Sequence, residues 1–279
     1  MIPRVLSSLV FFAVFLFGLY YTADWAGHII FFLVAFGTVM GTREYYNLAH
    51  LLKVRPSPWP GHAIALTFLV DAYFFQFEHF VHIFITCFWI LLITQVFLKS
   101  FDRAIINNAV SLFGSIYLGV PLAIVLFIFR HGPEAWALPS ATSGSDLIVF
   151  LVLTSWATDI GGYCFGKPFG KHKMSPNLSP NKSWEGLAGG ALLALVSGLL
   201  LWYLWPNMSA TLRLAEAALL PVGFTVVGTV GDLAESAFKR DAGVKDSGKT
   251  FTGHGGMLDI LDSLLLCAPV FYLYMSLTR

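Results

Sequence analysis

The chain has 279 residues, of which 57% are hydrophobic and 12% charged, about half the charged fraction of a typical soluble domain. This composition excludes an ordinary soluble globular protein. The formal net charge of +1 gives no sign of an acidic partner, and we expect no nucleic acid partner.

Nine apolar segments are predicted to cross a membrane, at residues 5–22, 26–42, 61–76, 80–98, 104–130, 147–165, 186–205, 214–235 and 256–277. They approach the roughly 20 residues that a membrane-spanning helix needs. Their apolar runs are continuous rather than alternating, which favours helices over a barrel. The segment at 61–76 is short and carries Asp71, and that at 104–130 contains Pro121, where we expect a bend or a break.

The sequence therefore predicts an all-α protein, a polytopic transmembrane helical bundle with about nine spans. We divide it into N-terminal transmembrane helices at 1–145 and C-terminal transmembrane helices at 146–279. The loops of the second part are expected to form the catalytic site.

Basic residues alternate between the loops and predict the orientation of the chain. The loops after the second, fourth, sixth and eighth segments hold Arg43, Lys53, Arg55, Lys99, Arg103, Lys167, Lys171, Lys173, Lys182, Lys239, Arg240, Lys245 and Lys249. We expect these loops to face the cytoplasm. The sequence thus predicts an integral multi-pass protein of a bacterial cytoplasmic (inner) membrane, with its active site on the cytoplasmic side.

Ionisable residues at membrane depth are usually functional, and a first group surrounds Asp159 near the end of the sixth segment. Gly161 and Gly162 follow it. Glycines allow close approach of a ligand or of a neighbouring helix. This group is therefore compatible with a binding site and with simple helix packing.

A second group recurs with helical spacing at Asp232, Glu235, Ser236 and Lys239. On a helix these residues share one face. That face is predicted to line a cavity or to contact another helix.

In the third group, a glycine-rich stretch containing His254 leads into the last apolar segment, where Asp259 and Asp262 lie three residues apart. A helix N-terminus suits an anion such as phosphate. Paired carboxylates beside phosphate favour Mg²⁺. The alternative is that these aspartates only meet the helix dipole.

At these residues the chain resembles the phosphatidate cytidylyltransferase family, also called CDP-diacylglycerol synthases. The positions that match the family pattern in type and spacing are Ser236, Lys239, Arg240, Lys245, Asp246, Gly248, His254, Gly255, Gly256, Asp259 and Asp262. The stretch from Asp159 to Gly186 also resembles the family, so the likeness covers the C-terminal half. The sequence departs from the pattern at Ile260, where the family has arginine, and at Thr252 and Lys249.

The resemblance implies that the cytidylyl group of CTP is transferred to phosphatidate or a similar phospholipid, giving CDP-diacylglycerol and pyrophosphate. It implies Mg²⁺ as cofactor, with room for a second cation, and a homodimer is considered. The catalytic candidates are Asp232, Glu235, Asp246, Asp259 and Asp262. The metal candidates are Asp232, Asp246, Asp259 and Asp262, with Asp159 and Glu235 as additions. The substrate-binding candidates are Lys171, Lys182, Ser236, Lys239, Arg240, Lys245, His254, Gly255 and Gly256.

Two alternatives stay open at this stage. A CTP-dependent lipid alcohol kinase would transfer a phosphate from CTP instead of the cytidylyl group. A membrane transporter or a non-catalytic paralogue would also carry intramembrane carboxylates, although a transporter is expected to show repeated halves, and we find none here.

Overall fold

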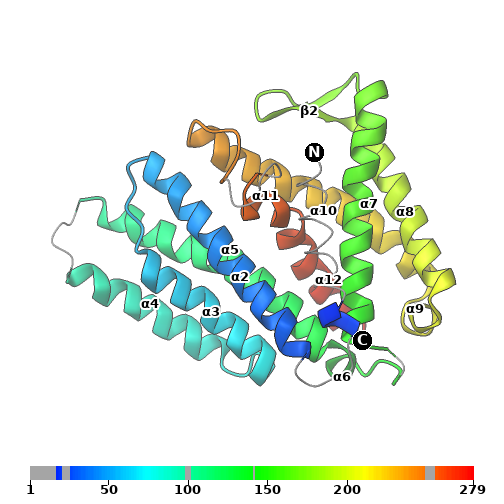
Figure 1. Cartoon of the computed structure of the whole chain (residues 1–279), viewed down its shortest axis with the longest axis horizontal. Helices are drawn as coiled ribbons and strands as arrows, with labels where there is room; N and C mark the ends of the chain where they lie inside the picture. Colours follow the sequence, from blue (N-terminus) through cyan, green and yellow to red (C-terminus); the bar gives the residue numbers. More distant parts are fainter. Residues whose placement is uncertain (1–16, 21–25, 98–101, 141, 249–254) are drawn as a thin grey trace. The chain divides into compact units, whose positions relative to one another are not determined.

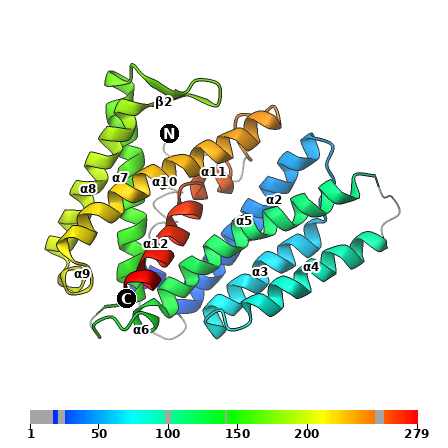
Figure 2. The same cartoon turned by 180° about the vertical axis from the view of Figure 1, so that it is seen from behind.

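The computed structural model describes residues 17–20, 26–97, 102–140, 142–248 and 255–279, and these are mainly helical (Figures 1 and 2). The helices are α2 (Ala26–Leu51), α3 (Pro58–Phe75), α4 (Phe80–Val96), α5 (Ala104–Arg130), α6 (Gly132–Ala135), α7 (Gly144–Phe169), α8 (Trp184–Leu204), α9 (Pro206–Thr211), α10 (Leu214–Asp241), α11 (Met257–Leu261) and α12 (Leu264–Thr278). A short hairpin joins β1 (Lys173–Ser175) to β2 (Ser179–Ser183). Each predicted segment from residue 26 onward lies mainly on described helix, whereas most of the segment at 5–22 lies outside the described residues.

Five stretches of the described chain are long and apolar enough to cross a bilayer: α5, α7, α8, α10 and the stretch Met257–Thr278. An all-α membrane bundle is therefore confirmed, while the count of nine spans stays a prediction. We expect a bend or a break at Pro121; helix α5 continues through this residue, so a break does not occur, and the bend stays a prediction. The last predicted segment is instead two helices, because α11 ends at Leu261 and α12 begins at Leu264.

The described residues pack as two compact units, each built from two stretches of the chain. The first unit takes its residues from 1–127 and 238–261, and the second from 128–237 and 262–279. The predicted division at residue 145 follows the distribution of motifs rather than packing, and it stays a prediction.

In the first unit, α3 packs against both α2 and α4, and α11 packs against α2. The fully buried Tyr46 fixes α2 by donating its hydroxyl to Ser111 O at 2.7 Å. A methyl group at Gly61 would lie 2.0 Å from the Tyr46 hydroxyl oxygen, so the glycine lets α3 approach this ring. The first unit thus holds α2 in a defined position.

In the second unit, glycines bring α7 and α8 into backbone contact. A Cβ at Gly161 would lie 2.6 Å from Gly189 O, and one at Gly190 would lie 2.9 Å from Thr158 O. Small residues at such spacing let membrane helices pack closely. The sequence leaves both a binding site and simple helix packing open for this glycine group, and the structure supports helix packing.

After α7 the sequence Ser175-Pro176-Asn177 recurs as Ser179-Pro180-Asn181, and this part of the chain forms the antiparallel hairpin of β1 and β2. Ser175 pairs with Ser179, and Lys173 with Ser183. Ser183 then caps α8 by accepting a hydrogen bond from Gly186 N at 3.1 Å, a typical role for serine at a helix N-terminus. The hairpin positions Lys182 on β2.

Candidate active site

The second unit contains a group of three carboxylates, Asp232, Glu235 and Asp262, which we call the carboxylate cluster. Each offers an oxygen, and these oxygens all lie within 4.8 Å of one another. Asp232 and Glu235 are one turn apart on α10, and Asp262 lies between α11 and α12. Gly231 allows this arrangement, because a Cβ there would lie 2.6 Å from Asp262 O.

The donor set of the carboxylate cluster fits a hard divalent cation. It consists of carboxylate oxygens alone, the ligands that Mg²⁺ prefers in proteins. Glu235 is fully buried, and Asp232 and Asp262 are half-buried. Carboxylates this close repel one another unless a cation or a proton compensates them. Asp232 and Glu235 thus lie close together, as their helical spacing predicts. With Asp262 they form a group that can hold a metal ion.

A lysine lies beside the carboxylate cluster. Lys182 Nζ is 2.6 Å from Asp232 Oδ2 and 3.4 Å from Thr229 O. Ser236 donates from Oγ to Asp232 Oδ1 at 3.4 Å. Asp159 interacts electrostatically with both Asp232 and Lys182, so it flanks the cluster without belonging to it. Lys182 thus provides a positive charge at which an anionic phosphate oxygen could bind.

The first unit contains a separate network around Asp259. The Asp259 Oδ1 atom is 2.5 Å from Lys239 Nζ. The Oδ2 atom accepts hydrogen bonds from Ser247 N at 3.1 Å, Ser247 Oγ at 2.8 Å and Gly256 N at 2.7 Å. Gly255 has φ +84°, and a Cβ there would lie 2.6 Å from Asp259 Oδ2. In this arrangement Asp259 binds protein donors and orders the ends of the loop between Ser247 and Gly256.

Glu44 on α2 is a member of this network that the sequence analysis missed. Its carboxylate is 4% exposed, and Oε2 accepts hydrogen bonds from Ser247 Oγ at 3.1 Å and from Leu258 N at 2.9 Å. A Cβ at Gly256 would lie 2.2 Å from Glu44 Oε2, and one at Gly248 would lie 2.3 Å from Oε1. Gly248 and Gly256, which match the family pattern, thus leave room for the Glu44 side chain.

The sequence signal for Glu44 was a charged residue at the end of the second apolar segment, in Arg43-Glu44-Tyr45-Tyr46. Glu44 has no role in the sequence analysis, because only the basic residues of this loop are used there. Glu44 approaches Ser247 across some 200 positions of the chain, and no local pattern reports such a contact.

The remaining site candidates are more exposed. Lys171, Lys245 and Asp246 are exposed, and Arg240 is exposed and donates to Val244 O at 2.9 Å. His254 lies outside the described residues, as do Lys249 and Thr252. The assignments of these residues to metal or substrate stay predictions.

Several known proteins are similar to this chain. The model of a cytidylyltransferase family matches residues 2–278. A phosphatidate cytidylyltransferase of Synechocystis is 32% identical over 265 residues, covering 88% of this chain and 87% of the relative. One of Chlamydia pneumoniae is 38% identical over 186 residues, covering 65% and 58%. An Escherichia coli protein, YnbB, whose name states no activity, is 40% identical over 154 residues, covering 54% and 50%. The match thus spans about half the length of the last two relatives.

Proposed function

The chain belongs to the cytidylyltransferase family, and we propose that it transfers the cytidylyl group of CTP to phosphatidate, giving CDP-diacylglycerol and pyrophosphate. The observation that carries this proposal is the carboxylate cluster, with Lys182 beside it. Two of the relatives are named for this activity. A group of acidic side chains next to a lysine, in a protein with membrane-spanning helices, suits a reaction between a soluble nucleotide and a lipid phosphate.

In the proposed reaction, a phosphate oxygen of the lipid attacks the α-phosphorus of CTP. The bond from this phosphorus to the bridging oxygen breaks, and pyrophosphate leaves with that oxygen. The lipid phosphate is already anionic, so no general base is required. Catalysis of this kind consists mainly of positioning and charge stabilisation.

The carboxylate cluster would hold Mg²⁺, which supplies Lewis-acid stabilisation to phosphate oxygens. Lys182 would release Asp232 and bind a non-bridging phosphate oxygen instead. The network around Asp259 would hold Ser247 and Gly256 in place. A second cation and a homodimer stay predictions.

We further propose that the reaction takes place at the cytoplasmic face of a bacterial inner membrane. CTP is soluble, whereas the acyl chains of phosphatidate remain in the bilayer. Lys182 belongs to a loop whose basic residues predict a cytoplasmic position. The bacterial relatives support such a membrane location.

The test uses the purified full chain with phosphatidate, Mg²⁺ and CTP labelled at the α- or the γ-phosphate. Cytidylyl transfer puts the α-label into the lipid and releases the γ-label as pyrophosphate. A lipid alcohol kinase given diacylglycerol would instead put the γ-label into the lipid. Failure of the α-label to enter the lipid under these conditions would refute the proposed reaction.

A variant links the reaction to the carboxylate cluster. Asp262→Asn is expected to lower turnover by at least about 100-fold, because a charged ligand of the cation is lost. Mg²⁺ should also raise the unfolding temperature of the native chain and not of this variant. Glu134→Gln, which changes an exposed carboxylate of the same unit, is the matched control.

A further inference from the structure

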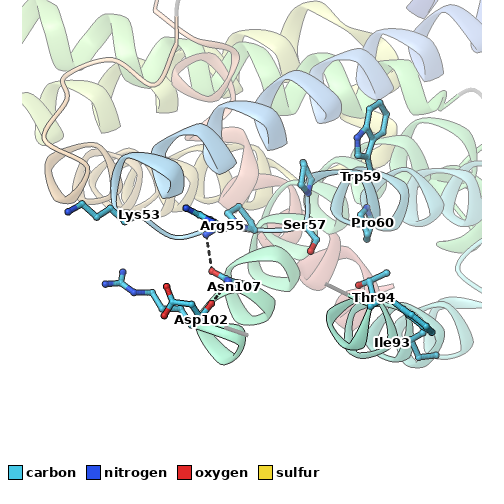
Figure 3. Close-up of a pocket in the computed structure, with 13 residues that line it drawn as sticks. Lys53, Arg55, Ser57, Trp59, Pro60, Ile93, Thr94, Asp102 and Asn107 are labelled. Carbon is cyan, nitrogen blue, oxygen red and sulfur yellow. Dashed lines mark hydrogen bonds between the residues drawn. The ribbon is translucent and has the colours of Figure 1, made fainter. Parts of the chain in front are cut away.

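The first unit contains a pocket of about 660 Å³ at the end of α2, the start of α3, the end of α4 and the start of α5 (Figure 3). It is lined by Lys53, Arg55, Pro56, Ser57, Pro58, Trp59, Pro60, Ile93, Thr94, Phe97, Asp102, Arg103 and Asn107. None of these residues belongs to the carboxylate cluster or to the Asp259 network. A volume of this size suits a small organic group.

One end of the pocket is cationic. It carries Lys53, Arg55 and Arg103 against the single carboxylate of Asp102. Within the described chain, the side chains of Lys53 and Arg55 form no hydrogen bond or ion pair, and Arg103 Nη1 is 3.5 Å from Leu52 O. Positive charge is therefore in excess here and is available to an anion.

The backbone around these cations is fixed. Asn107 is buried, and its Oδ1 accepts a hydrogen bond from Arg55 N at 2.8 Å while its Nδ2 donates to Asp102 O at 3.0 Å (Figure 3). Lys53 and Arg103 have φ of 60° and 54°, a region that residues other than glycine seldom adopt. These contacts hold the backbone from which the basic side chains extend.

The other end of the pocket is apolar. Figure 3 shows Trp59 and Ile93 away from Lys53, across the pocket. Trp59 is 84% and Phe97 80% exposed. Helix α4, which contributes Ile93 and Thr94 to the pocket, also exposes Val81, Phe84, Ile85, Phe88, Trp89, Ile90, Leu92 and Val96. An apolar surface of this extent indicates contact with acyl chains.

We propose that this pocket binds an anionic phospholipid, with the phosphate headgroup at Lys53, Arg55 and Arg103 and an acyl chain along α4. The charge of the pocket complements a phosphate, and its apolar end complements a lipid rather than a soluble ion. Basic pockets between membrane helices bind lipid headgroups in this way, and interfacial tryptophan commonly marks the headgroup level. The inference does not depend on the proposed activity.

The test measures phosphatidylglycerol retained by the full chain in native mass spectrometry, with phosphatidylcholine and glycerol 1-phosphate as comparison ligands. The pocket variant is Lys53→Gln with Arg55→Gln. The control variant, Lys173→Gln with Arg213→Gln, removes two exposed cations of the other unit. Each charge near a membrane surface contributes about fivefold in affinity, so the pocket variant should bind phosphatidylglycerol about 30-fold more weakly.

The control variant should keep its affinity, and Trp59→Ala should weaken lipid binding without changing the affinity for glycerol 1-phosphate. Equal losses in the pocket and control variants, or no loss in either, would overturn the proposal. So would equal binding of phosphatidylcholine, or glycerol 1-phosphate bound as tightly as the lipid, which would indicate a free phosphate site. If the pocket variant does not fold, Arg103→Gln gives the same comparison with one charge.

Discussion

Removal of the Glu44 carboxylate should loosen both the start of α11 and Ser247. Its Oε2 atom accepts hydrogen bonds from both Ser247 Oγ and Leu258 N. Leu258 is in the first turn of α11, where backbone N–H groups have no partner within the helix. Among the residues that the structure describes, Glu44→Ala leaves this N–H without an acceptor.

The size of the effect follows from these two bonds. A hydrogen bond to a charged group contributes about 1.5–3 kcal/mol, and an unsatisfied buried donor costs a similar amount. Glu44→Ala should therefore favour local opening by about 3 kcal/mol, which is about 100-fold in the opening equilibrium. Glu44→Gln should be much milder, because the amide oxygen can replace Oε2 and accept both bonds.

Amide hydrogen exchange measures this directly at Leu258. The Leu258 amide should exchange about 100-fold faster in Glu44→Ala, with a smaller change in Glu44→Gln. Glu78→Ala removes an exposed carboxylate of the same unit and should change nothing. If Leu258 exchanges at the native rate in Glu44→Ala, the carboxylate does not hold α11, and the role we assign to Glu44 is wrong.

Three further outcomes are expected. Lys182→Met should raise the apparent affinity for Mg²⁺ by up to about fivefold, because a positive charge 2.6 Å from Asp232 is removed. The same variant should raise KM for CTP. Weaker Mg²⁺ binding would contradict this expectation. Gly256→Ala should lower the free energy of unfolding by about 1–3 kcal/mol, because the new Cβ would lie 2.2 Å from both Glu44 Oε2 and Ser247 Oγ. Gly223→Ala is the control, because a Cβ there would have nothing within 4 Å, and it should raise the free energy of unfolding by about 0.5–1 kcal/mol. A cysteine at Asn177, in a cysteine-free background, should be labelled only from the cytoplasmic side, and labelling from the periplasm would invert the predicted topology.

The helical class could be predicted from the sequence, because an apolar run has few ways to satisfy its backbone in lipid. The contact of Asp232 with Glu235 could also be predicted, since residues three apart on a helix share a face. The position of Lys182 could be anticipated only as that of a basic loop residue. Its contact with Asp232 depends on the hairpin, whose register is set by the pairing of β1 with β2.

The prediction for Asp259 and Asp262 rested on one continuous helix, and this premise is wrong. Asp259 is in α11, whereas Asp262 follows its last residue. Asp262 lies with Asp232 and Glu235, while Asp259 accepts hydrogen bonds from Ser247 N and Gly256 N. Two aspartates that form one motif in the sequence therefore have different partners in the structure, which are other carboxylates for Asp262 and hydrogen-bond donors for Asp259. A three-residue spacing predicts a shared role only where the helix between the two residues is intact.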